Sequence, residues 1–562
     1  MTKRYTKQMA NGAELFVDAC QQLGIDHIFT LVGDHLNEVL SVAAARGLHI
    51  IDFRHESGVT HAADCWGRLT RKPALSLITG GPGHTNSLTG IATAQLSGSP
   101  LIAVSGAPAI NMRERIVFQD IDQVGMARPV CKWAAEAASV AQIPFLLSRA
   151  YRESSSGRMG ATHLTIPVDL FTGDAKTVIQ PSEPHTSSPP APNRHDVNRM
   201  LQLLRQAKSP MVIAGSGVWW SNAGKELEKF LSKTKLPYYN VTLARGVVSD
   251  LYRYNMGYAD GALNQAVHTI FKEADVVLVL GKRIDYRLAM GGPRLFSPQA
   301  KFIQVDIHPQ ELGHNRNLEL SVCADVKTTL CAMLEELENE PAWKPLPWLK
   351  HTTQLRDQWK AELQSIAESN AKNKRIHPAS FFAALQQAMP VTPLYSWDGG
   401  DFIHWGRAMY PAIHPGGWMR IGPLGTIGSA LPNAIAMQLH HPKSPVVMIT
   451  GDGSLGFYIA ELDTAVRHNL PIIVIVGNDG GWGLERELQG ELNGTNVACE
   501  LRQTRYDIVM KGFGGDGETI DRLHQVDGAV KRAFASQKPY LLNVNIEGAR
   551  SPFTDWQIKG KK

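Results

Sequence analysis

One stretch, residues 446–489, constrains the fold of this 562-residue chain more than any other part of the sequence. It opens with an apolar run, Val446–Ile449, which predicts a buried strand, and continues with a Gly-Asp-Gly-Ser turn at 451–454. An amphipathic helix is expected as far as about His468, followed by a second buried strand over Ile472–Val476. This order predicts a βαβ unit in a parallel sheet that is covered on both faces.

An acidic residue follows each strand of this unit: Asp452 follows the first, and Asp479 follows the second, 27 positions later. Because ligands bind at the carboxyl ends of parallel strands, we expect both carboxylates at one edge of the sheet. Carboxylates among glycines suit a hard divalent cation, and close backbone amides suit a diphosphate. Either turn alone is better explained as a tight turn. The pair favours a site for a metal-bridged diphosphate.

The same stretch resembles the cofactor motif of the thiamine diphosphate-dependent enzymes, in which a GDG turn precedes an Asn pair by about one βαβ unit. In that family, the Asp of the turn, the second residue of the pair and a backbone carbonyl two positions later bind Mg²⁺. The resemblance implies Asp452, Asp479 and the carbonyl of Gly481 as metal ligands. The family usually has Asn where this chain has Asp479, so the chain adds a negative charge to the site.

The N-terminal region also has an α/β pattern. Helical periodicity at 12–23 precedes apolar runs that predict strands, and an alanine-rich helix is expected at Val59–Thr70. The predicted strands are His27–Val32, His49–Phe53, Ala74–Thr79 and Leu101–Ser105. Such alternation predicts a doubly wound parallel sheet whose functional edge lies at its strand ends.

Glu56 follows the second of these strands and has two interpretations. A Glu at the start of a helix is commonly a favourable first-turn charge. However, Arg54-His55-Glu56 followed by Ala62-Ala63-Asp64 resembles the family pattern RHE-x5-AA(D/E), whose Glu contacts N1′ of the aminopyrimidine. Sharing a proton with N1′ favours the imino tautomer that removes the thiazolium C2 proton. The resemblance therefore implies a catalytic Glu56.

Two further catalytic candidates lie in loops of the same region. The segment 80–86 resembles the family turn GPG-x-TN, with His84 at its variable position. A solvated residue near a helix start is an equally good interpretation of His84. Gln119 matches a Gln near the reacting carbon in acetolactate synthases and benzaldehyde lyase, the alternative being a surface-loop residue. Val32 occupies the position of a catalytic His in benzaldehyde lyase, which argues against that acid–base scheme.

The resemblance also implies further cofactor contacts in the C-terminal third of the chain. Ile427 matches the bulky residue that bends the cofactor into a V shape and so brings its rings into reach of each other. Many acetolactate synthases have Gln-His where this chain has Asp401-Phe402. The implied cofactor-binding residues are Glu56, Gly399, Gly400, Gly425, Thr426, Ile427, Gly451, Asp452, Gly453, Ser454, Asp479, Trp482 and Gly483.

Three doubly wound α/β domains are predicted: a pyrimidine-binding domain at 1–180, a central half-Rossmann-like domain at 196–340 and a diphosphate-binding domain at 377–562. A Pro- and Ser-rich linker at 181–195 and a charged, helical connector at 341–376 separate them. In related enzymes the central domain holds FAD, an ADP-like group or no ligand. Glycine turns after its strands do not distinguish these alternatives. The segment 282–287 partly resembles an FAD-contacting pattern.

Composition argues against several other classes of protein. A formal net charge of +5 is small for this length and gives no indication of a nucleic-acid partner. The six cysteines are scattered without a CxxC pair, which fits a reducing compartment such as the cytoplasm. The first residues lack the apolar run of a signal peptide, and no segment approaches the ~18 apolar residues of a membrane span. We therefore expect a cytoplasmic protein without a membrane partner.

Within the family, four strings resemble acetolactate-synthase-like 2-hydroxyacyl-CoA lyases: FTLVGDH at 29–35, WDGGDF at 397–402, VGNDGGW at 476–482 and GTNVAC at 494–499. They favour a lyase that reversibly cleaves a 2-hydroxyacyl-CoA to an aldehyde and formyl-CoA. One alternative is acetolactate synthase-type decarboxylation and carboligation of pyruvate or another 2-oxo acid. A second alternative, from outside the enzymes, is a catalytically silent cofactor-binding scaffold, against which Glu56 argues.

The resemblance further implies a homo-oligomer, because in this family each active site lies between two subunits. A dimer is the minimum, and a homotetramer is expected. The C-terminal tail from Ser551 ends in Lys559, Lys561 and Lys562. Basic residues there would suit CoA phosphates, but a solvated chain end is the favoured interpretation.

Overall fold

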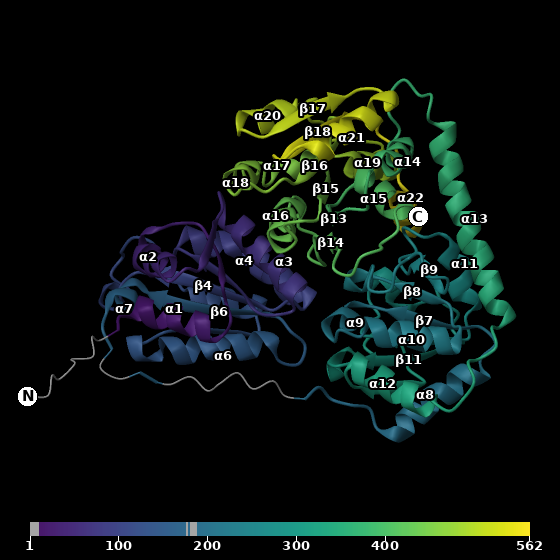
Figure 1. Cartoon of the computed structure of the whole chain (residues 1–562), viewed down its shortest axis with the longest axis horizontal. Helices are drawn as coiled ribbons and strands as arrows, with labels where there is room; N and C mark the ends of the chain where they lie inside the picture. The colour runs from purple at the N-terminus through teal and green to yellow at the C-terminus, as the bar shows by residue number, and fades with distance from the viewer. Residues whose placement is uncertain (1–9, 176–177, 180–187, 562) are drawn as a thin grey trace, which may run out of the picture. The chain divides into compact units, whose positions relative to one another are not determined.

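The computed structural model describes residues 10–175, 178–179 and 188–561. Within these residues the named strands form three six-stranded sheets, and every pairing between neighbouring strands is parallel. Helices flank each sheet (Figure 1). The predicted fold class is confirmed. Part of the predicted linker, 181–187, lies outside the described residues, as do residues 1–9 and Lys562.

The first sheet has the strand order β2-β1-β3-β4-β6-β5. Helices α3 and α4 pack side by side on one face, while α1 and α6 pack together on the other (Figure 1). Its strands are β1 His27–Thr30, β2 His49–Asp52, β3 Ala74–Ile78, β4 Leu101–Ala107, β5 Trp133–Glu136 and β6 Ala161–Pro167. Its helices are α1 Gly12–Gln22, α2 Asn37–Ala45, α3 Glu56–Thr70, α4 Pro82–Ser97, α5 Gln123–Ala127, α6 Ile143–Ser155 and α7 Val168–Thr172.

The second sheet has the order β12-β11-β10-β7-β8-β9. The glycine turns after its strands pack against each other, since a Cβ on Gly217 would lie 2.5 Å from the Cα of Gly281. The strands are β7 Pro210–Ala214, β8 Tyr238–Asn240, β9 Asn255–Tyr258, β10 Val276–Leu280, β11 Lys301–Asp306 and β12 Leu320–Cys323. The helices are α8 Arg194–Gln206, α9 Ser216–Trp220, α10 Gly224–Thr234, α11 Ala266–Glu273 and α12 Val326–Glu336.

The third sheet has the order β14-β13-β15-β16-β18-β17. Its strands are β13 Leu394–Trp397, β14 Trp418–Arg420, β15 Val446–Gly451, β16 Ile473–Asn478, β17 Asp516–Ile520 and β18 Tyr540–Asn545. The helices of this part of the chain are α14 Pro378–Ala388, α15 Asp401–Met409, α16 Ala430–His440, α17 Asp452–Gly456, α18 Glu461–Arg467, α19 Gly483–Asn493, α20 Tyr506–Gly512, α21 Val526–Ala535 and α22 Pro552–Lys561. The single helix expected after β15 is wrong, because α17 and α18 are separate.

By its contacts the chain divides into two compact units. The first is drawn from Met1–Thr186, Ile421–Lys443 and Phe457–Leu470, and so includes α16 and α18. The second is drawn from Ser187–Arg420, Ser444–Gly456 and Pro471–Lys562, and holds the second and third sheets. The predicted domain boundaries stay predictions.

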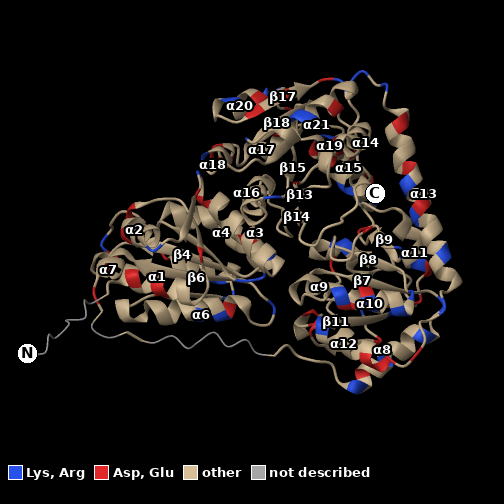
Figure 2. Ribbon diagram, viewed as in Figure 1, with Lys and Arg blue, Asp and Glu red and all other residues tan. Residues whose placement is uncertain are grey.

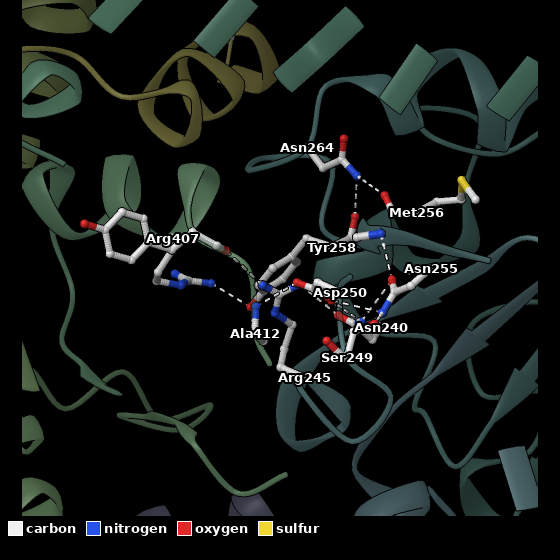
Figure 3. A network of polar contacts seen from close by, with 12 residues as sticks. Asn240, Arg245, Ser249, Asp250, Asn255, Met256, Tyr258, Asn264, Arg407 and Ala412 are labelled. Carbon is white, nitrogen blue, oxygen red and sulfur yellow. Dashed lines mark hydrogen bonds and ion pairs between the residues drawn. The ribbon is translucent and has the colours of Figure 1, made fainter. Parts of the chain in front are cut away.

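The second unit is held together by a long helix and by a buried polar network. Helix α13, Pro347–Ser369, lies along α11, β9 and α14, and Figure 2 shows acidic and basic residues interspersed along it. Arg407 of α15 donates to the hydroxyl of Tyr258 at 2.7 Å, and Asp250 accepts from the backbone N–H of Ala412 at 2.9 Å (Figure 3). These contacts fix α15 against the second sheet.

The hydrophobicity of the helices and the state of the cysteines can also be described. Among the described residues, no helix combines the length and the hydrophobicity that crossing a bilayer requires. All six cysteines have free thiols, three of them buried.

Candidate active site

The two acidic turns lie at neighbouring strand ends in the second unit. Strands β15 and β16 pair in parallel with Gly451 opposite Gly477, so Asp452 and Asp479 both follow directly from the same edge of the sheet. Oδ2 of Asp452 accepts the backbone N–H of Gly481 at 3.0 Å. The structure therefore brings together the strand ends that carry all three predicted metal ligands.

Both carboxyl groups are enclosed, Asp452 with 2% of its surface exposed and the Asp479 side chain with 10%. Burial and the neighbouring negative charge of Asp479 raise the pKa of Asp452 to about 7. Burial also raises the pKa of Asp479, while Arg486, 3.4 Å away, opposes that shift. Two buried like charges disfavour ionisation, and a cation between them would reverse the effect.

The loop after β16 is held from two sides. The side chain of Asn478 donates to Asn543 and to the carbonyl of Thr504, and accepts the N–H of Gly480. The backbones of Gly480 and Trp482 pair with Leu501 and Cys499 at 2.7 Å each. The Trp482 ring covers Gly453, where a Cβ would lie 2.7 Å from it. The GDG turn and the loop that carries Asp479 and Gly481 are thus packed together.

The turn at 398–402 is tied to the same strand edge. Asp398 accepts from the Thr450 hydroxyl and from the N–H of Gly399, both at 2.9 Å, and Gly400 takes a φ of 106° that favours glycine. Asp401 instead accepts from the backbone and hydroxyl of Ser551 and from the hydroxyl of Thr554. The Phe402 ring packs on Gly477. Asp401 and Phe402, the two residues that differ from many acetolactate synthases, are thus engaged by the protein itself.

Those contacts correct one expectation about the C-terminal tail. A solvated chain end was favoured, but Ser551, Pro552, Thr554 and Ile558 are buried and α22 packs on α15. Only the last part, with Lys559 and Lys561, is exposed.

In the first unit, Glu56 is the first residue of α3. Its Oε2 accepts from Nδ2 of Asn86 on α4 at 3.0 Å. Gln119 lies beside the turn that starts α4, since a Cβ on Gly81 would be 2.8 Å from its Cβ. Gln119 and Gly81 both have positive φ angles, 63° and 61°. Glu56, Asn86 and Gln119 therefore belong to adjoining segments at the starts of α3 and α4.

His84 does not share these contacts. Its side chain is fully buried, its Nδ1 lies 3.0 Å from the Ser105 hydroxyl, and its ring lies 4.6 Å from that of His163. Burial lowers the pKa of His84 to about 4. The solvated interpretation is wrong, and any influence of His84 on a ligand would act through the position of α4.

The glycine loop with Gly425, Thr426 and Ile427 also belongs to the first unit. The Thr426 hydroxyl lies 3.3 Å from that of Thr93 on α4, and Gly425 has open space around its Cβ position. Ile427 is half-buried. The loop therefore lies along α4, the helix that also carries Asn86.

In the central region, the charged pattern at 282–287 is largely paired within the protein. Lys282 pairs with Asp285 at 2.5 Å, and Arg287 pairs with Asp260 at 2.8 Å. These pairs engage Lys282, Asp285 and Arg287 within the protein. The alternatives of FAD, an ADP-like group or no ligand are separated by an absorption spectrum and by analysis of nucleotides released from the purified protein.

Sequence reasoning missed several residues that support the site, including Asn86, Asn478, Glu461 and Arg486. Asn86 and Asn478 stand inside the quoted motifs, so their residue type was a usable signal. Glu461 lies in the stretch 446–489, but its partner is 407 positions away at Arg54. No local pattern reveals such a contact.

The residues present fit a divalent cation bound with a diphosphate. Two enclosed carboxylates with raised pKa values meet at one sheet edge beside glycine turns. Across the described ranges, no group of three or more His, Cys, Asp or Glu side chains is arranged to hold a metal ion. Two carboxylates plus a backbone carbonyl, the predicted set, require no such group.

Three sequence-family models match the chain. They are described as the thiamine pyrophosphate enzyme N-terminal TPP binding domain at residues 10–126, central domain at 197–333 and C-terminal TPP binding domain at 398–544. Thiamine pyrophosphate (TPP) is another name for thiamine diphosphate.

Curated relatives align over nearly the whole chain. An acetolactate synthase large subunit of Mycobacterium tuberculosis is 32% identical over 544 residues, 96% of each chain. A 2-hydroxyacyl-CoA lyase 2 of Caenorhabditis elegans is 30% identical over 588 residues, covering 96% of this chain and 90% of the relative. An oxalyl-CoA decarboxylase of Escherichia coli is 29% identical over 559 residues, 96% of each chain.

Proposed function

This chain belongs to the thiamine pyrophosphate enzyme family, and on that premise we propose that it is a Mg²⁺-dependent carbon–carbon lyase that cleaves a 2-hydroxyacyl-CoA. In the proposed reaction, the bond between the carbinol carbon and the thioester carbonyl breaks. The hydroxyl group loses its proton and becomes the aldehyde carbonyl, and the thioester carbon gains a proton to give formyl-CoA. The reverse reaction is a carboligation.

The observation that carries the cofactor assignment is the meeting of Asp452 and Asp479 at register-matched strand ends. We assign the metal to these carboxylates and the Gly481 carbonyl, and the diphosphate to the turns around Gly399, Gly453 and Gly483. When bound, thiamine diphosphate supplies a carbanion-forming centre that acts as an electron sink. The protein supplies binding, orientation and proton control.

We assign proton control to Glu56, which would hold a proton at N1′ of the cofactor. Its contact with Asn86 fixes the direction of the carboxyl group, which a proton-sharing role requires. Ile427 would support the bent cofactor, and Gln119 would face the substrate. His84, buried between α4 and the sheet, would act only by positioning its helix.

The substrate proposal rests on the four strings that resemble acetolactate-synthase-like 2-hydroxyacyl-CoA lyases, together with the matching relative at 30% identity. The alternative function, acetolactate synthesis from pyruvate, is supported by a relative of nearly equal identity, 32%. Because the two identities are nearly equal, they do not distinguish the two reactions. A panel of substrates distinguishes them.

The panel consists of purified protein with Mg²⁺, thiamine diphosphate and, separately, 2-hydroxyacyl-CoAs of several chain lengths, oxalyl-CoA and pyruvate. We expect aldehyde and formyl-CoA in equal amounts from a 2-hydroxyacyl-CoA, and neither when the cofactor or metal is omitted. A Glu56→Gln control should form neither product. Rapid pyruvate consumption without aldehyde release would overturn the lyase assignment in favour of acetolactate synthesis.

We further propose a homo-oligomer, at least a dimer and by family resemblance a tetramer, with each active site between two subunits. A cytoplasmic location is proposed from the six free thiols. Small-molecule substrates are proposed as its partners, and no nucleic acid or membrane.

A further inference from the structure

Helix α18 lies against the start of α3, the helix that begins with Glu56, and both belong to the first compact unit. The contact is made by Glu461, the first residue of α18, whose side chain is fully buried. Both of its carboxylate oxygens accept the backbone N–H of Arg54, at 3.3 and 3.1 Å. The carboxylate thus binds the backbone two residues before Glu56.

The position of this carboxylate has a physical reason. The first N–H groups of a helix lack partners within the helix, and its N-terminus carries a partial positive charge. At α3, the imidazole of His55 accepts the N–H of Ser57 at 3.1 Å, which leaves the N–H groups upstream to other acceptors. Glu461 supplies such an acceptor beside the positive end of the helix, and burial raises the pKa of its carboxyl to about 7.

Neighbouring contacts fix the carboxylate itself. The hydroxyl of Thr464 donates to its Oε2 at 2.6 Å. Oε1 lies where a side chain on Gly58 would begin, 2.6 Å from the Cβ position, so glycine leaves the necessary room. The hydroxyls of Ser57 and Tyr458 lie 2.7 Å apart beside it. The start of α3 is therefore held at residues 54 and 57, on both sides of Glu56.

The Glu56 carboxyl is oriented by a different element, since it accepts from Asn86 on α4. Its backbone and its side chain are thus held by two separate contacts. Small displacements of a reacting group are costly, because a shift of about 1 Å can lower a rate about 100-fold.

We propose that Glu461 is a positioning residue that holds the backbone of Glu56 at the place where its carboxyl shares a proton with the cofactor. The inference rests on the proposed role of Glu56 and not on the identity of the acyl substrate. Helix α18, which lies in the sequence between Asp452 and Asp479, would thereby support a proton-sharing group some 400 positions earlier in the chain.

Asp463, on the same helix, offers a matched control. Its Oδ2 pairs with the guanidinium of Arg54 at 2.9 Å, so it contacts the same residue through the side chain and not through the backbone. It also pairs with Arg467 at 2.8 Å. Removing its charge disturbs the same interface while leaving the backbone anchor intact.

The experiment measures hydrogen–deuterium exchange at C2 of bound thiamine diphosphate in the Mg²⁺-loaded holoenzyme, together with cofactor affinity and thermal stability. Three variants are compared with the wild type: Glu461→Ala, Glu461→Gln and Asp463→Asn. We expect exchange to slow about 100-fold in Glu461→Ala and about tenfold in Glu461→Gln, which keeps one acceptor oxygen. Asp463→Asn should stay within about twofold of the wild type, and all three should bind the cofactor with unchanged affinity.

Wild-type exchange in folded Glu461→Ala, or an equal loss in Asp463→Asn, would overturn the proposal. So would a loss that follows weaker cofactor binding. Should Glu461→Ala not fold, the comparison of Glu461→Gln with Asp463→Asn decides. The exchange assay contains no acyl substrate, so it does not depend on the substrate proposal. If exchange is slow in the Glu461 variants but the wild-type enzyme does not cleave 2-hydroxyacyl-CoAs, only the substrate proposal is refuted.

Discussion

Asp452 and Asp479 place two negative charges on one buried strand edge. Taking a charge out of water is unfavourable, and a second like charge nearby adds to that cost. Arg486 lies 3.4 Å from Asp479 but also pairs with Glu500 at 3.0 Å, so its charge is shared. Without a cation the two carboxylates therefore repel each other. This repulsion is the physical consequence of having Asp where the family usually has Asn.

Replacing Asp479 with Asn should raise the melting temperature of the metal-free protein, because one buried charge and its repulsion are removed. We expect an increase of a few degrees, corresponding to about 1–2 kcal/mol. The stabilisation gained on adding Mg²⁺ with thiamine diphosphate should shrink by a similar amount. Thermal unfolding with and without the metal and cofactor measures both effects.

Asp463→Asn serves as the control, since Asp463 carries an exposed ion pair in the other compact unit. A lower melting temperature for metal-free Asp479→Asn would contradict the repulsion, and would mean that the pair with Arg486 outweighs it.

Single residues differ in how far the sequence predicts them. The places of Asp452, Asp479 and Glu56 were predictable because each follows a recognisable strand, and their roles stay predictions. Glu461 was not, because its role depends on a contact with Arg54 that only the fold creates. For His84 the sequence left two interpretations open, a residue near the ligand and a solvated residue. The second is wrong, because the side chain is buried against Ser105 and His163 of the sheet.

At the scale of elements, α22 is held on α15 by one carboxyl group. Oδ1 of Asp401 accepts from the N–H of Ser551 at 3.2 Å, from its hydroxyl and from the hydroxyl of Thr554. Burial raises the pKa of Asp401 to about 6, although these hydrogen bonds oppose the shift. The folded state therefore prefers the neutral acid, and Oδ2 is buried without a partner.

The sign of the pH dependence follows from that preference. An Asp whose folded-state pKa lies above its unfolded value contributes stability below about pH 4, and loses it as the pH rises through about 6. Asp401→Asn keeps the accepting oxygen and cannot ionise. We expect α22 in this variant to be more protected at pH 8 by up to about 3 kcal/mol, and at pH 5 by about half as much.

Amide hydrogen exchange of residues 552–561, corrected for intrinsic rates at each pH, measures this protection. Asp555→Asn is the control, because Asp555 lies on the same helix with a side chain 44% exposed. If wild type and Asp401→Asn showed the same change between pH 5 and pH 8, Asp401 would not be the titrating group.

Elements were predictable where hydrophobic periodicity was strong. The strand expected at Ile472–Val476 appears as β16, shifted by one residue at its start and two at its end. The helix expected after Asp452 is interrupted at Phe457–Ala460, because this part of the chain packs with the first unit through Tyr458 and Glu461. The tail was wrongly expected to be solvated, since its binding depends on Asp401, 150 positions earlier.

At the scale of the molecule, three parallel sheets follow from alternating strand and helix patterns, and they match the three family models. The substrate does not follow, because the shared cofactor motifs correspond to chemistry that the family has in common. Relatives named for three different reactions align at 29–32% identity over the full chain. The subunit arrangement likewise depends on surfaces that no local pattern defines.

A mixing experiment tests whether each site is built from two chains. Glu56→Gln and Asp452→Ala should each be inactive alone. When they are co-expressed, half of the dimers should contain one of each, and in those one of the two sites has both residues intact. About a quarter of wild-type activity should therefore return. Co-expression of two tagged copies of Glu56→Gln is the control, and a mixture as inactive as that control would contradict a shared site.

C2 exchange in holoenzyme carrying Glu56→Gln tests most directly whether Glu56 activates thiamine diphosphate bound at the Asp452–Asp479 edge. Glutamine keeps the size of the side chain but cannot share a proton in the same way. We predict unchanged cofactor affinity and an exchange rate lower by at least about 100-fold. An unchanged exchange rate with the cofactor fully bound would contradict the role assigned to Glu56.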